Sequence, residues 1–290
     1  MDVEFRGVFT ALVTPFSSDG STVDFESFEG LIAFQRRAGI DGYVVCGSTG
    51  EAATLADTEY EQVVKRVRSL IPDKPVLAGI SVSSTTKAVE MARVIEQLGC
   101  DGVLLATPPY NKPSQSGIIE HFKHVRNATE LPIIAYNIPG RSGVSIEAST
   151  LATLSREGVI SGVKESSGSV DTFMDVRIAV GETCGVLSGE DSLFLATLAC
   201  GGQGIISASA NVLPEAFRTV WQAWREGATE VATEAQLSVL PRIRLLFRET
   251  NPVPVKTALA RLGVIKSATV RLPLVPVSNE NYDLICEAFI

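Results

Sequence analysis

The sequence has few histidines and no closely spaced cysteines, which leaves little material for a metal site or a disulfide framework. Its 290 residues include two histidines and five cysteines, and no Cys-x-x-Cys pair occurs. An odd number of scattered cysteines argues against a disulfide-stabilised secreted domain and fits a reducing compartment. We therefore expect a cytoplasmic protein without structural zinc.

Long apolar runs and basic blocks are also missing from the sequence. No stretch reaches the roughly 18 consecutive apolar residues of a membrane span, and the N-terminus lacks the pattern of a secretory signal. The formal net charge is −8, from 33 acidic and 25 basic residues. This balance offers no electrostatic footprint for nucleic acid or an anionic membrane. The expected partners are small molecules and other subunits.

Short apolar runs recur along the chain, and segments with helical spacing separate them. The runs begin near residues 7, 42, 75, 102, 132, 159, 185 and 204. Buried strands that alternate with helices indicate a parallel sheet with crossover helices. Eight such units favour a closed (β/α)8 barrel, the TIM barrel, over an open doubly wound sheet. The glycine-rich dinucleotide turn of the open sheet does not follow the first run.

The C-terminal part of the chain is longer than a barrel requires. Residues 213–290 have helical spacing for most of their length, which exceeds the eighth helix of a barrel. We predict a barrel over residues 1–225 that carries the active site, followed by a helical extension over residues 226–290.

One lysine stands among the residues at the predicted strand ends, where barrel enzymes place their reactive groups. Lys164 closes the apolar run 159–163 and precedes a Ser-Ser-Gly turn. An amine attacks a carbonyl only when it is unprotonated, and an apolar barrel interior favours the neutral form. Lys164 is therefore a candidate for Schiff-base formation. The alternative is a solvated lysine paired with Glu165.

Other strand-end residues supply groups that such chemistry uses. Tyr136 has a phenol that can carry protons, although a core aromatic residue is the alternative. Ser48 and Thr49 lie in a GSTGE turn whose hydroxyls and amides can cradle a carboxylate, or which serves only as a connector. Arg141 can form a bidentate pair with a carboxylate, or be a solvated loop residue.

The two histidines, His121 and His124, are three residues apart in a predicted helix. That spacing is compatible with a metal ion. The helix lies away from the strand ends, however, so we expect surface residues and no metal-dependent aldolase.

Nine motifs together resemble one family, the class I pyruvate aldolases and synthases typified by dihydrodipicolinate synthase and N-acetylneuraminate lyase. In chain order they are ALVTPF, GSTGE, TPPYNKPSQSG, YNIPGRSGV, GVKESSG, LSGEDS, GGQGIISASANV, NPVPVK and RLPLVP. They run from residue 11 to residue 276, which is nearly the whole chain. The resemblance implies a (β/α)8 barrel with a C-terminal helical extension and no metal or organic cofactor.

The resemblance assigns catalytic roles to four residues. Lys164 is similar to the lysine that forms the imine with pyruvate, and Tyr136 to the phenol that shuttles protons to and from it. Thr49 resembles the relay partner of that phenol. Tyr110 resembles the tyrosine that completes the relay from a neighbouring subunit, which implies a homo-oligomer, usually a tetramer built as a dimer of dimers.

The resemblance also implies the substrate contacts. The backbone amides of Ser48 and Thr49 would hold the pyruvate carboxylate, and Arg141 would bind the carboxylate of the aldehyde. Gly189 and Ile206 match positions that line the pyruvate pocket.

Within the family, Arg141 together with NPVPVK and RLPLVP favours a synthase. We expect condensation of pyruvate with L-aspartate 4-semialdehyde to 4-hydroxy-tetrahydrodipicolinate, the committed step toward diaminopimelate and lysine. Other Schiff-base enzymes of the family are the alternative: an N-acetylneuraminate lyase, a 2-keto-3-deoxy sugar acid aldolase or a hydratase-aldolase. A barrel that only binds a keto acid or a protein partner is a further alternative.

Lysine-inhibited synthases of the family bind lysine in a cleft at a subunit contact. The aligned positions here are Ala52, Asp57, Tyr60, Ser83, Lys87 and Pro109. Lys87 stands where an acidic residue is needed, and its cation would repel the ammonium of the effector. We expect lysine feedback to be weak or absent.

Overall fold

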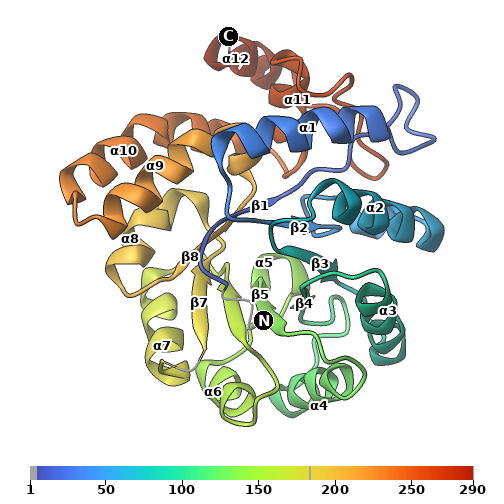
Figure 1. The fold of residues 1–290 in the computed structure, drawn as a ribbon, viewed down its shortest axis with the longest axis vertical. Helices are drawn as coiled ribbons and strands as arrows, with labels where there is room; N and C mark the ends of the chain where they lie inside the picture. Colours follow the sequence, from blue (N-terminus) through green and yellow to red (C-terminus); the bar gives the residue numbers. More distant parts are fainter. Residues whose placement is uncertain (1–4, 183, 290) are drawn as a thin grey trace.

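The computed structural model describes residues 5–182 and 184–289, and within them eight parallel strands form a closed barrel. Each strand pairs with the next along the chain, and the last pairs with the first (Figure 1). The strands are β1 Gly7–Ala11, β2 Gly42–Val45, β3 Val76–Ile80, β4 Gly102–Ala106, β5 Ile133–Asn137, β6 Gly162–Glu165, β7 Gly185–Ser188 and β8 Gly204–Ser207. The predicted (β/α)8 barrel is confirmed.

Helices connect the strands and surround the barrel (Figure 1). The longer ones are α1 Phe25–Ala38, α2 Asp57–Leu70, α3 Thr85–Gln97, α4 Gln115–Arg126, α6 Ala148–Arg156, α7 Val170–Val180, α8 Phe194–Ala199 and α9 Pro214–Arg225. Short helical turns follow four strands: η1 Ala52–Thr54, α5 Pro139–Ser142, η2 Asp191–Leu193 and η3 Ser209–Asn211. The turns place polar side chains at the strand ends.

Side-chain caps fix where several of these helices begin. The side chains of Asp24, Ser84, Ser114 and Ser169 each accept a hydrogen bond from the backbone amide three residues later. Such a cap satisfies one of the first amides of a helix, which have no partner inside the helix. The sequence therefore sets the ends of these loops locally.

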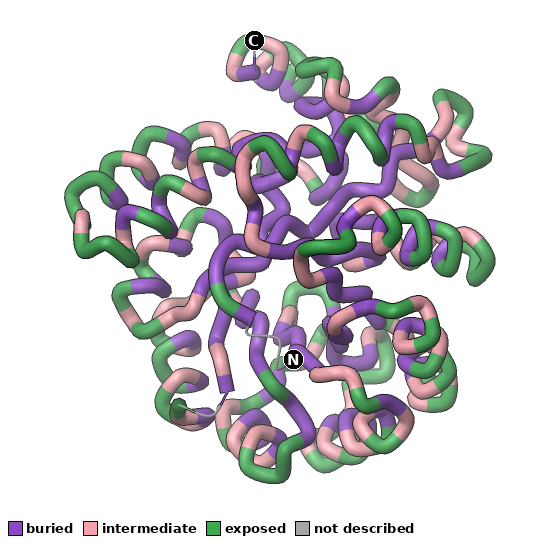
Figure 2. Tube along the Cα trace, in the orientation of Figure 1, coloured by how far each residue is buried: buried purple, intermediate pink, exposed green. Residues whose placement is uncertain are grey.

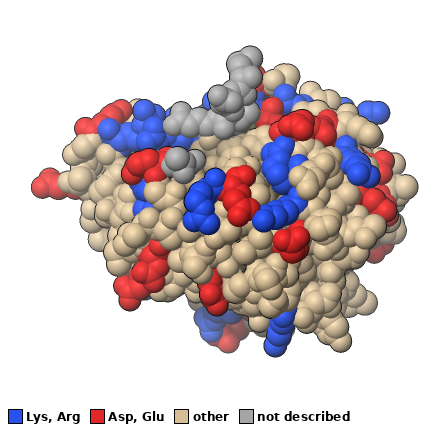
Figure 3. Space-filling view, turned by 90° about the horizontal axis from the view of Figure 1, so that it is seen from below, with Lys and Arg blue, Asp and Glu red and all other residues tan. Residues whose placement is uncertain are grey.

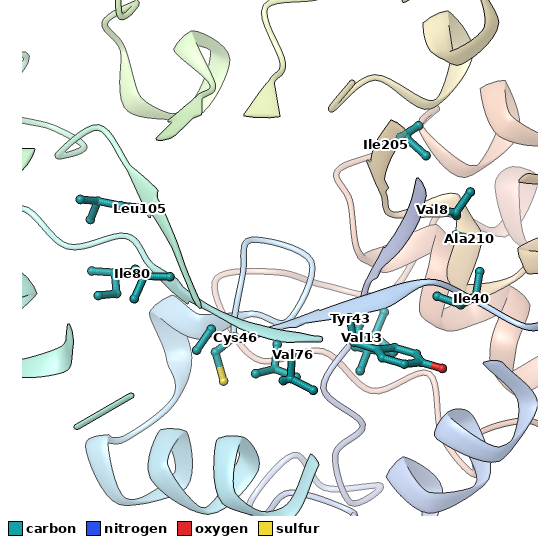
Figure 4. Packing of buried hydrophobic residues seen from close by; sticks show 14 of the residues in the cluster. Val8, Val13, Ile40, Tyr43, Cys46, Val76, Ile80, Leu105, Ile205 and Ala210 are labelled. Atoms are coloured by element: carbon teal, nitrogen blue, oxygen red, sulfur yellow. The ribbon is translucent and has the colours of Figure 1, made fainter. Parts of the chain in front are cut away.

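Two layers of apolar side chains build the core. Inside the barrel lie alternate strand residues such as Phe9, Leu104, Ile134 and Leu187. Their neighbours along each strand point outward against the helices, as Val8, Val76, Leu105 and Ile205 do in Figure 4. Apart from the half-buried Gly185, the strand residues are accordingly buried, whereas most helices have one buried face (Figure 2).

The C-terminal extension consists of α10 Thr229–Leu246, α11 Val253–Arg261 and α12 Asn279–Ala288. α10 packs on α9, and α12 packs on α10 and α11. All residues from 251 to 259 are buried, so the chain returns to the barrel at this point. The division of the chain at residue 225 stays a prediction.

The surface bears charges of both signs. On the face drawn in Figure 3, lysine and arginine side chains alternate with aspartate and glutamate side chains. Among the described residues, no helix combines the length and the apolar character that crossing a membrane requires.

Candidate functional site

Lys164 and Tyr136 lie side by side in the barrel. They are paired residues of β6 and β5, and the Lys164 Nζ atom lies 4.1 Å from the centroid of the Tyr136 ring. Both are buried, with exposed fractions of 6% and 7%. Lys164 lies at the end of β6, as expected, and the pairing with both neighbouring strands continues for one more residue, to Glu165.

Lys164 and Glu165 point to opposite faces of the barrel, as successive strand residues do. The Glu165 carboxylate accepts hydrogen bonds of 2.7 Å from the Asn137 side-chain amide and from the Ser167 backbone amide. Glu165 thus fastens the loop after β6, and the Lys164 amine faces the barrel interior. This arrangement contradicts the alternative of a solvated lysine paired with Glu165.

A cavity of about 630 Å³ opens at the Lys164 amine. It is lined by Ser48, Thr49, Tyr136, Ile138, Gly140, Arg141, Lys164, Ser166, Gly189, Glu190, Ile206, Ala208, Phe247, Arg248, Glu249, Thr250 and Asn251. Seven of the eight residues predicted for the site therefore share one cavity, and they come from loops and strands distant in sequence.

Gly189 leaves room for the lysine side chain. A Cβ atom on Gly189 would lie 1.7 Å from the Ser166 Oγ atom and 2.9 Å from the Lys164 Cε atom. Both distances are shorter than nonbonded atoms allow. The requirement for glycine at this position is therefore steric.

Two acidic groups lie beside the lysine. Burial raises the pKa of Glu190 to about 7, the charge of Asp191 adds to this, and the Lys164 cation opposes it. Burial also raises the pKa of Asp191, whose carboxylate accepts a hydrogen bond of 2.7 Å from the Ser209 amide. Glu190 consequently changes its charge near neutral pH, at the wall of the cavity.

The turn after β2 presents backbone amides to the cavity. It is flanked by Cys46 and Glu51, whose φ angles of 51° and 53° lie in the left-handed region that side chains disfavour. Within the described residues, the Ser48 and Thr49 amides donate to no protein acceptor. Adjacent unpaired amides in such a turn form a suitable site for an anion.

A buried ion pair holds this turn to the C-terminal extension. The Lys256 Nζ atom lies 2.6 Å from the Glu51 Oε1 atom and 4.1 Å from the centroid of the Phe16 ring. The Arg271 backbone amide donates to the other Glu51 oxygen at 3.0 Å. Burial lowers the pKa of Lys256 to about 8, and the Glu51 carboxylate opposes that shift.

Asn251 connects two of the predicted site residues. Its side-chain Nδ2 donates to the Thr49 Oγ1 atom at 2.9 Å, and its backbone carbonyl accepts from Arg141 Nη2 at 2.8 Å. Reasoning from the sequence assigned no role to Asn251, Glu51 or Lys256. The NPVPVK and GSTGE motifs contain them, but the motifs do not show which residues meet.

Tyr110 lies apart from the other predicted residues. Its side chain is 91% exposed, and it does not line the cavity at Lys164. A second cavity of about 310 Å³ adjoins the first and shares Ser48, Ile138, Arg141 and Asn251 with it. Within one chain, Tyr110 and Lys164 are therefore not brought together.

The two histidines differ in burial, and His124 is exposed, as expected. His121 is only 3% exposed, and its Nδ1 atom lies 2.9 Å from the Thr85 Oγ1 atom. The expectation of a surface residue is wrong for His121, because it shares the buried face of α4 with Ile118, Phe122 and Val125. Burial lowers its pKa to about 4. Across residues 5–182 and 184–289, no group of three or more potential ligands is arranged to hold a metal.

A third cavity, of about 470 Å³, is lined by five of the six positions aligned with the lysine-binding cleft, whereas Pro109 lines the cavity of about 310 Å³. Lys87 Nζ lies 2.7 Å from the Asp57 Oδ2 atom, so the two side chains form an ion pair there. The Ser83 hydroxyl donates to the Pro109 carbonyl at 3.0 Å. The side-chain cation of Lys87 thus lies in this cleft, at the position that the alignment gave it.

Comparisons with known proteins give one consistent family. The sequence model of the dihydrodipicolinate synthetase family matches residues 4–288 of this chain. A 4-hydroxy-tetrahydrodipicolinate synthase of Citrifermentans bemidjiense is 41% identical over 278 residues, covering 96% of this chain and 95% of that protein. The dihydrodipicolinate synthase of Aquifex aeolicus has a TM-score of 0.94 at 39% identity, with 98% of this chain and 97% of that chain covered.

A further similar solved structure contains pyruvate. It is a chloride-inhibited dihydrodipicolinate synthase from Acinetobacter baumannii in complex with pyruvate. The TM-score is 0.95 at 35% identity, with 98% of each chain covered.

Proposed function

The chain belongs to the dihydrodipicolinate synthetase family, and we infer from this premise that it is a 4-hydroxy-tetrahydrodipicolinate synthase. It condenses pyruvate with L-aspartate 4-semialdehyde, a step toward diaminopimelate and lysine. Curated relatives at about 40% identity over nearly the full chain carry this activity in their names, which favours it over the other aldolases and lyases of the family.

Lys164 is the nucleophile in this proposal. Its neutral amine attacks the keto carbon of pyruvate, and the carbinolamine then loses water to give an imine. Loss of a proton from the methyl carbon gives an enamine, which attacks the aldehyde carbon. The burial of Lys164 and the space above Gly189 support this role. No metal or organic cofactor is needed, because the lysine itself activates pyruvate.

Tyr136 and Thr49 carry the protons in the same proposal. The hydroxyl group of the carbinolamine must gain a proton to leave as water, and a phenol beside the lysine can supply it. The distance of 4.1 Å between the Lys164 Nζ atom and the Tyr136 ring centroid supports this assignment. Thr49 lines the same cavity and has a hydroxyl that can both accept and donate.

The carboxylates of the two substrates bind on different sides of the cavity. The unpaired Ser48 and Thr49 amides suit the carboxylate of pyruvate. Arg141 suits the carboxylate of the aldehyde, since a guanidinium presents two parallel donors. Gly189 and Ile206 shape the wall around the three carbons of pyruvate.

Tyr110 completes the relay from a second copy of the chain. Its 91% exposed side chain and the cavity of about 310 Å³ next to the first cavity support an exchange of this tyrosine between subunits. The assembly we propose is a homotetramer arranged as a dimer of dimers. We place it in the cytoplasm, which suits the five unpaired cysteines.

Trapping the imine tests the proposal. Borohydride reduction in the presence of pyruvate is expected to add a three-carbon group at Lys164, found by mass spectrometry of the peptides. Lys164→Ala is the control and is expected to gain no adduct. Native protein without an adduct would rule out the Schiff-base mechanism.

The choice of aldehyde has a test of its own. The protein is supplied with pyruvate and L-aspartate 4-semialdehyde, N-acetylmannosamine or a sugar-derived aldehyde in parallel. We expect turnover with the semialdehyde to be fastest by ~100-fold or more, since a pocket built for one substrate leaves polar groups unpaired with another. Preference for a sugar aldehyde would assign a different member of the family.

A further inference from the structure

The aldehyde substrate of the proposed reaction carries a charged group that still lacks a partner. L-aspartate 4-semialdehyde has an aldehyde, a carboxylate and an α-ammonium group. In the proposed function, the enamine at Lys164 attacks the aldehyde carbon, and Arg141 binds the carboxylate. The ammonium group needs a carboxylate or neutral acceptors of its own, because a cation held in a cavity without such groups is unfavourable.

The product of the reaction determines where the ammonium group has to lie. The product is a six-membered ring that contains this nitrogen. After the nitrogen has lost a proton, it bonds to the pyruvate carbon that Lys164 holds as an imine, and Lys164 leaves as a free amine. Such a step requires the two atoms to be held close together. The site for the ammonium group must therefore lie on the Lys164 side of the cavity.

Two acidic residues, Glu190 and Glu249, line the cavity at Lys164. Glu249 is already paired, because its Oε1 atom accepts hydrogen bonds from the Ser278 hydroxyl at 2.8 Å and from the Ser278 amide at 3.1 Å. The Glu190 side chain, in contrast, has neither a hydrogen bond nor an ion pair with any other residue that the structure describes. A cation that enters the cavity would meet an unpaired carboxylate at Glu190.

Glu190 lies on the required side of the cavity. It directly follows Gly189, where an added Cβ atom would be 2.9 Å from the Lys164 Cε atom. Burial and the charge of Asp191 raise the pKa of Glu190, and the Lys164 cation lowers it, so the charges of Glu190 and Lys164 are close enough to interact. An ammonium group held by Glu190 would thus be near the carbon that Lys164 carries.

Ser166 supplies a second polar group at the same place. Its side chain also lines the cavity, and the residue is only 7% exposed. Among residues 5–182 and 184–289, the Ser166 Oγ atom has no hydrogen-bond partner. A Cβ atom on Gly189 would lie 1.7 Å from this oxygen, so the hydroxyl lies against the backbone that precedes Glu190. A buried hydroxyl without a partner is unfavourable, and an N–H group of a ligand would satisfy it.

We propose that Glu190 and Ser166 form the subsite for the ammonium group of the aldehyde substrate, with the Glu190 carboxylate as its counter-ion and the Ser166 hydroxyl as a hydrogen-bond acceptor. The proposal rests on the proposed function, because the aldehyde is the substrate of a synthase. Together with Arg141, this subsite would hold the substrate at both charged groups. An aldehyde without an amine would gain nothing from Glu190.

A comparison of two aldehydes tests the proposal. Succinate semialdehyde has the carboxylate and the aldehyde of the substrate but no ammonium group. We expect Glu190→Gln to raise the KM for L-aspartate 4-semialdehyde by roughly tenfold or more, since a hydrogen bond to a charged group is lost. The inhibition constant of succinate semialdehyde is expected to stay within about twofold of the native value. Equal changes for both aldehydes, or no change for either, would overturn the proposal.

Ser166→Ala gives an independent measurement on the same subsite. We expect it to raise the KM for L-aspartate 4-semialdehyde by about threefold or more and to leave the inhibition constant of succinate semialdehyde unchanged. If Glu190→Gln does not fold, Ser166→Ala takes its place in the comparison of the two aldehydes. Glu190→Asp retains the charge on a shorter side chain, so its KM is expected to lie between the values of native protein and Glu190→Gln.

The pyruvate half-reaction distinguishes this role from a simpler one. If Glu190 were only a counter-ion of Lys164, Glu190→Gln would change the KM for pyruvate and the rate of borohydride trapping. We expect both quantities to stay within about twofold of the native values. A larger change in either of them, without a selective loss for the amine-bearing aldehyde, would refute the subsite.

Two controls separate this proposal from the proposed function. Glu215→Gln removes an exposed carboxylate in the first turn of α9, away from both cavities, and is expected to leave the constants for both aldehydes unchanged. Borohydride trapping with pyruvate is expected to succeed in native protein. Its failure there would refute the Schiff-base function, whereas successful trapping with parallel effects on both aldehydes would refute only the subsite.

Discussion

At the scale of single residues, steric space at the lysine matters as much as the lysine itself. Gly189 has no side chain at the point where a Cβ atom would overlap Ser166 and Lys164. We expect Gly189→Ala to displace the amine and lower kcat/KM by ~100-fold or more, because small misplacements of reacting atoms are costly. Gly117→Ala is the control, since the nearest atom to its added Cβ would be 3.4 Å away. Equal activity of both variants would contradict this account.

A second prediction at this scale concerns the pH dependence of stability. Glu190 has a pKa of about 7 in the folded protein and an ordinary value of 4.5. Between these values the folded state binds more protons than the unfolded chain, so the Glu190 contribution to stability falls as pH rises. Glu190→Gln lacks this change of charge. We expect the Tm of the native protein minus the Tm of Glu190→Gln to decrease as the pH rises from 5 to 7.5. A difference that does not change with pH would refute this prediction.

At the scale of elements, the turn after β2 depends on α11. Lys256 and Glu51 have side chains that are 0% and 1% exposed, so removing one leaves the other charge buried and unpaired. We expect Lys256→Met to lower the free energy of unfolding by about 3–5 kcal/mol, measured with urea. The double variant Lys256→Met, Glu51→Gln is expected to lose less free energy of unfolding than Lys256→Met alone.

An exposed ion pair is the control for this prediction. Lys266 pairs with Glu26, and the two side chains are 59% and 76% exposed. Lys266→Met is expected to cost about 1 kcal/mol or less. Similar losses for Lys256→Met and Lys266→Met would contradict an anchoring role for the buried pair.

At the scale of the whole molecule, the proposed exchange of Tyr110 makes two copies of the chain interdependent. We expect Tyr110→Ala and Lys164→Ala to be nearly inactive alone. After they are mixed and allowed to exchange subunits, half of the dimers contain one of each. One of the two sites in such a dimer has both native residues, so activity is expected to return to about a quarter of the native value. No recovery would contradict the shared site.

The cleft at Lys87 leads to a prediction about regulation of the whole assembly. Lys87 pairs with Asp57 at a position where lysine-inhibited synthases need an acidic residue, so we expect its cation to repel the ammonium of an effector. We expect millimolar lysine to leave the rate of the purified protein nearly unchanged. Strong inhibition in a lysine titration would overturn this expectation. Lys87→Glu is expected to increase the sensitivity.

The sequence by itself determined the architecture of this protein. Short apolar runs and helical spacings are local, so the eight strands and their helices could be recognised without any tertiary contact. Seven of the eight predicted site residues line one cavity because strand ends of a parallel barrel meet at the same edge. The position of Lys164 at such an end followed from the same rule.

Only the tertiary structure decided which distant residues meet. Asn251 contacts Thr49 across 202 positions, and Lys256 contacts Glu51 across 205. Pairs of this kind have no signature in the local sequence, because each residue fits the pattern of its own segment. The burial of His121 likewise depended on where α4 packs. The space beside Lys164 depends on where β7 brings Gly189, because steric overlap is a property of folded neighbours and not of spacing along the chain.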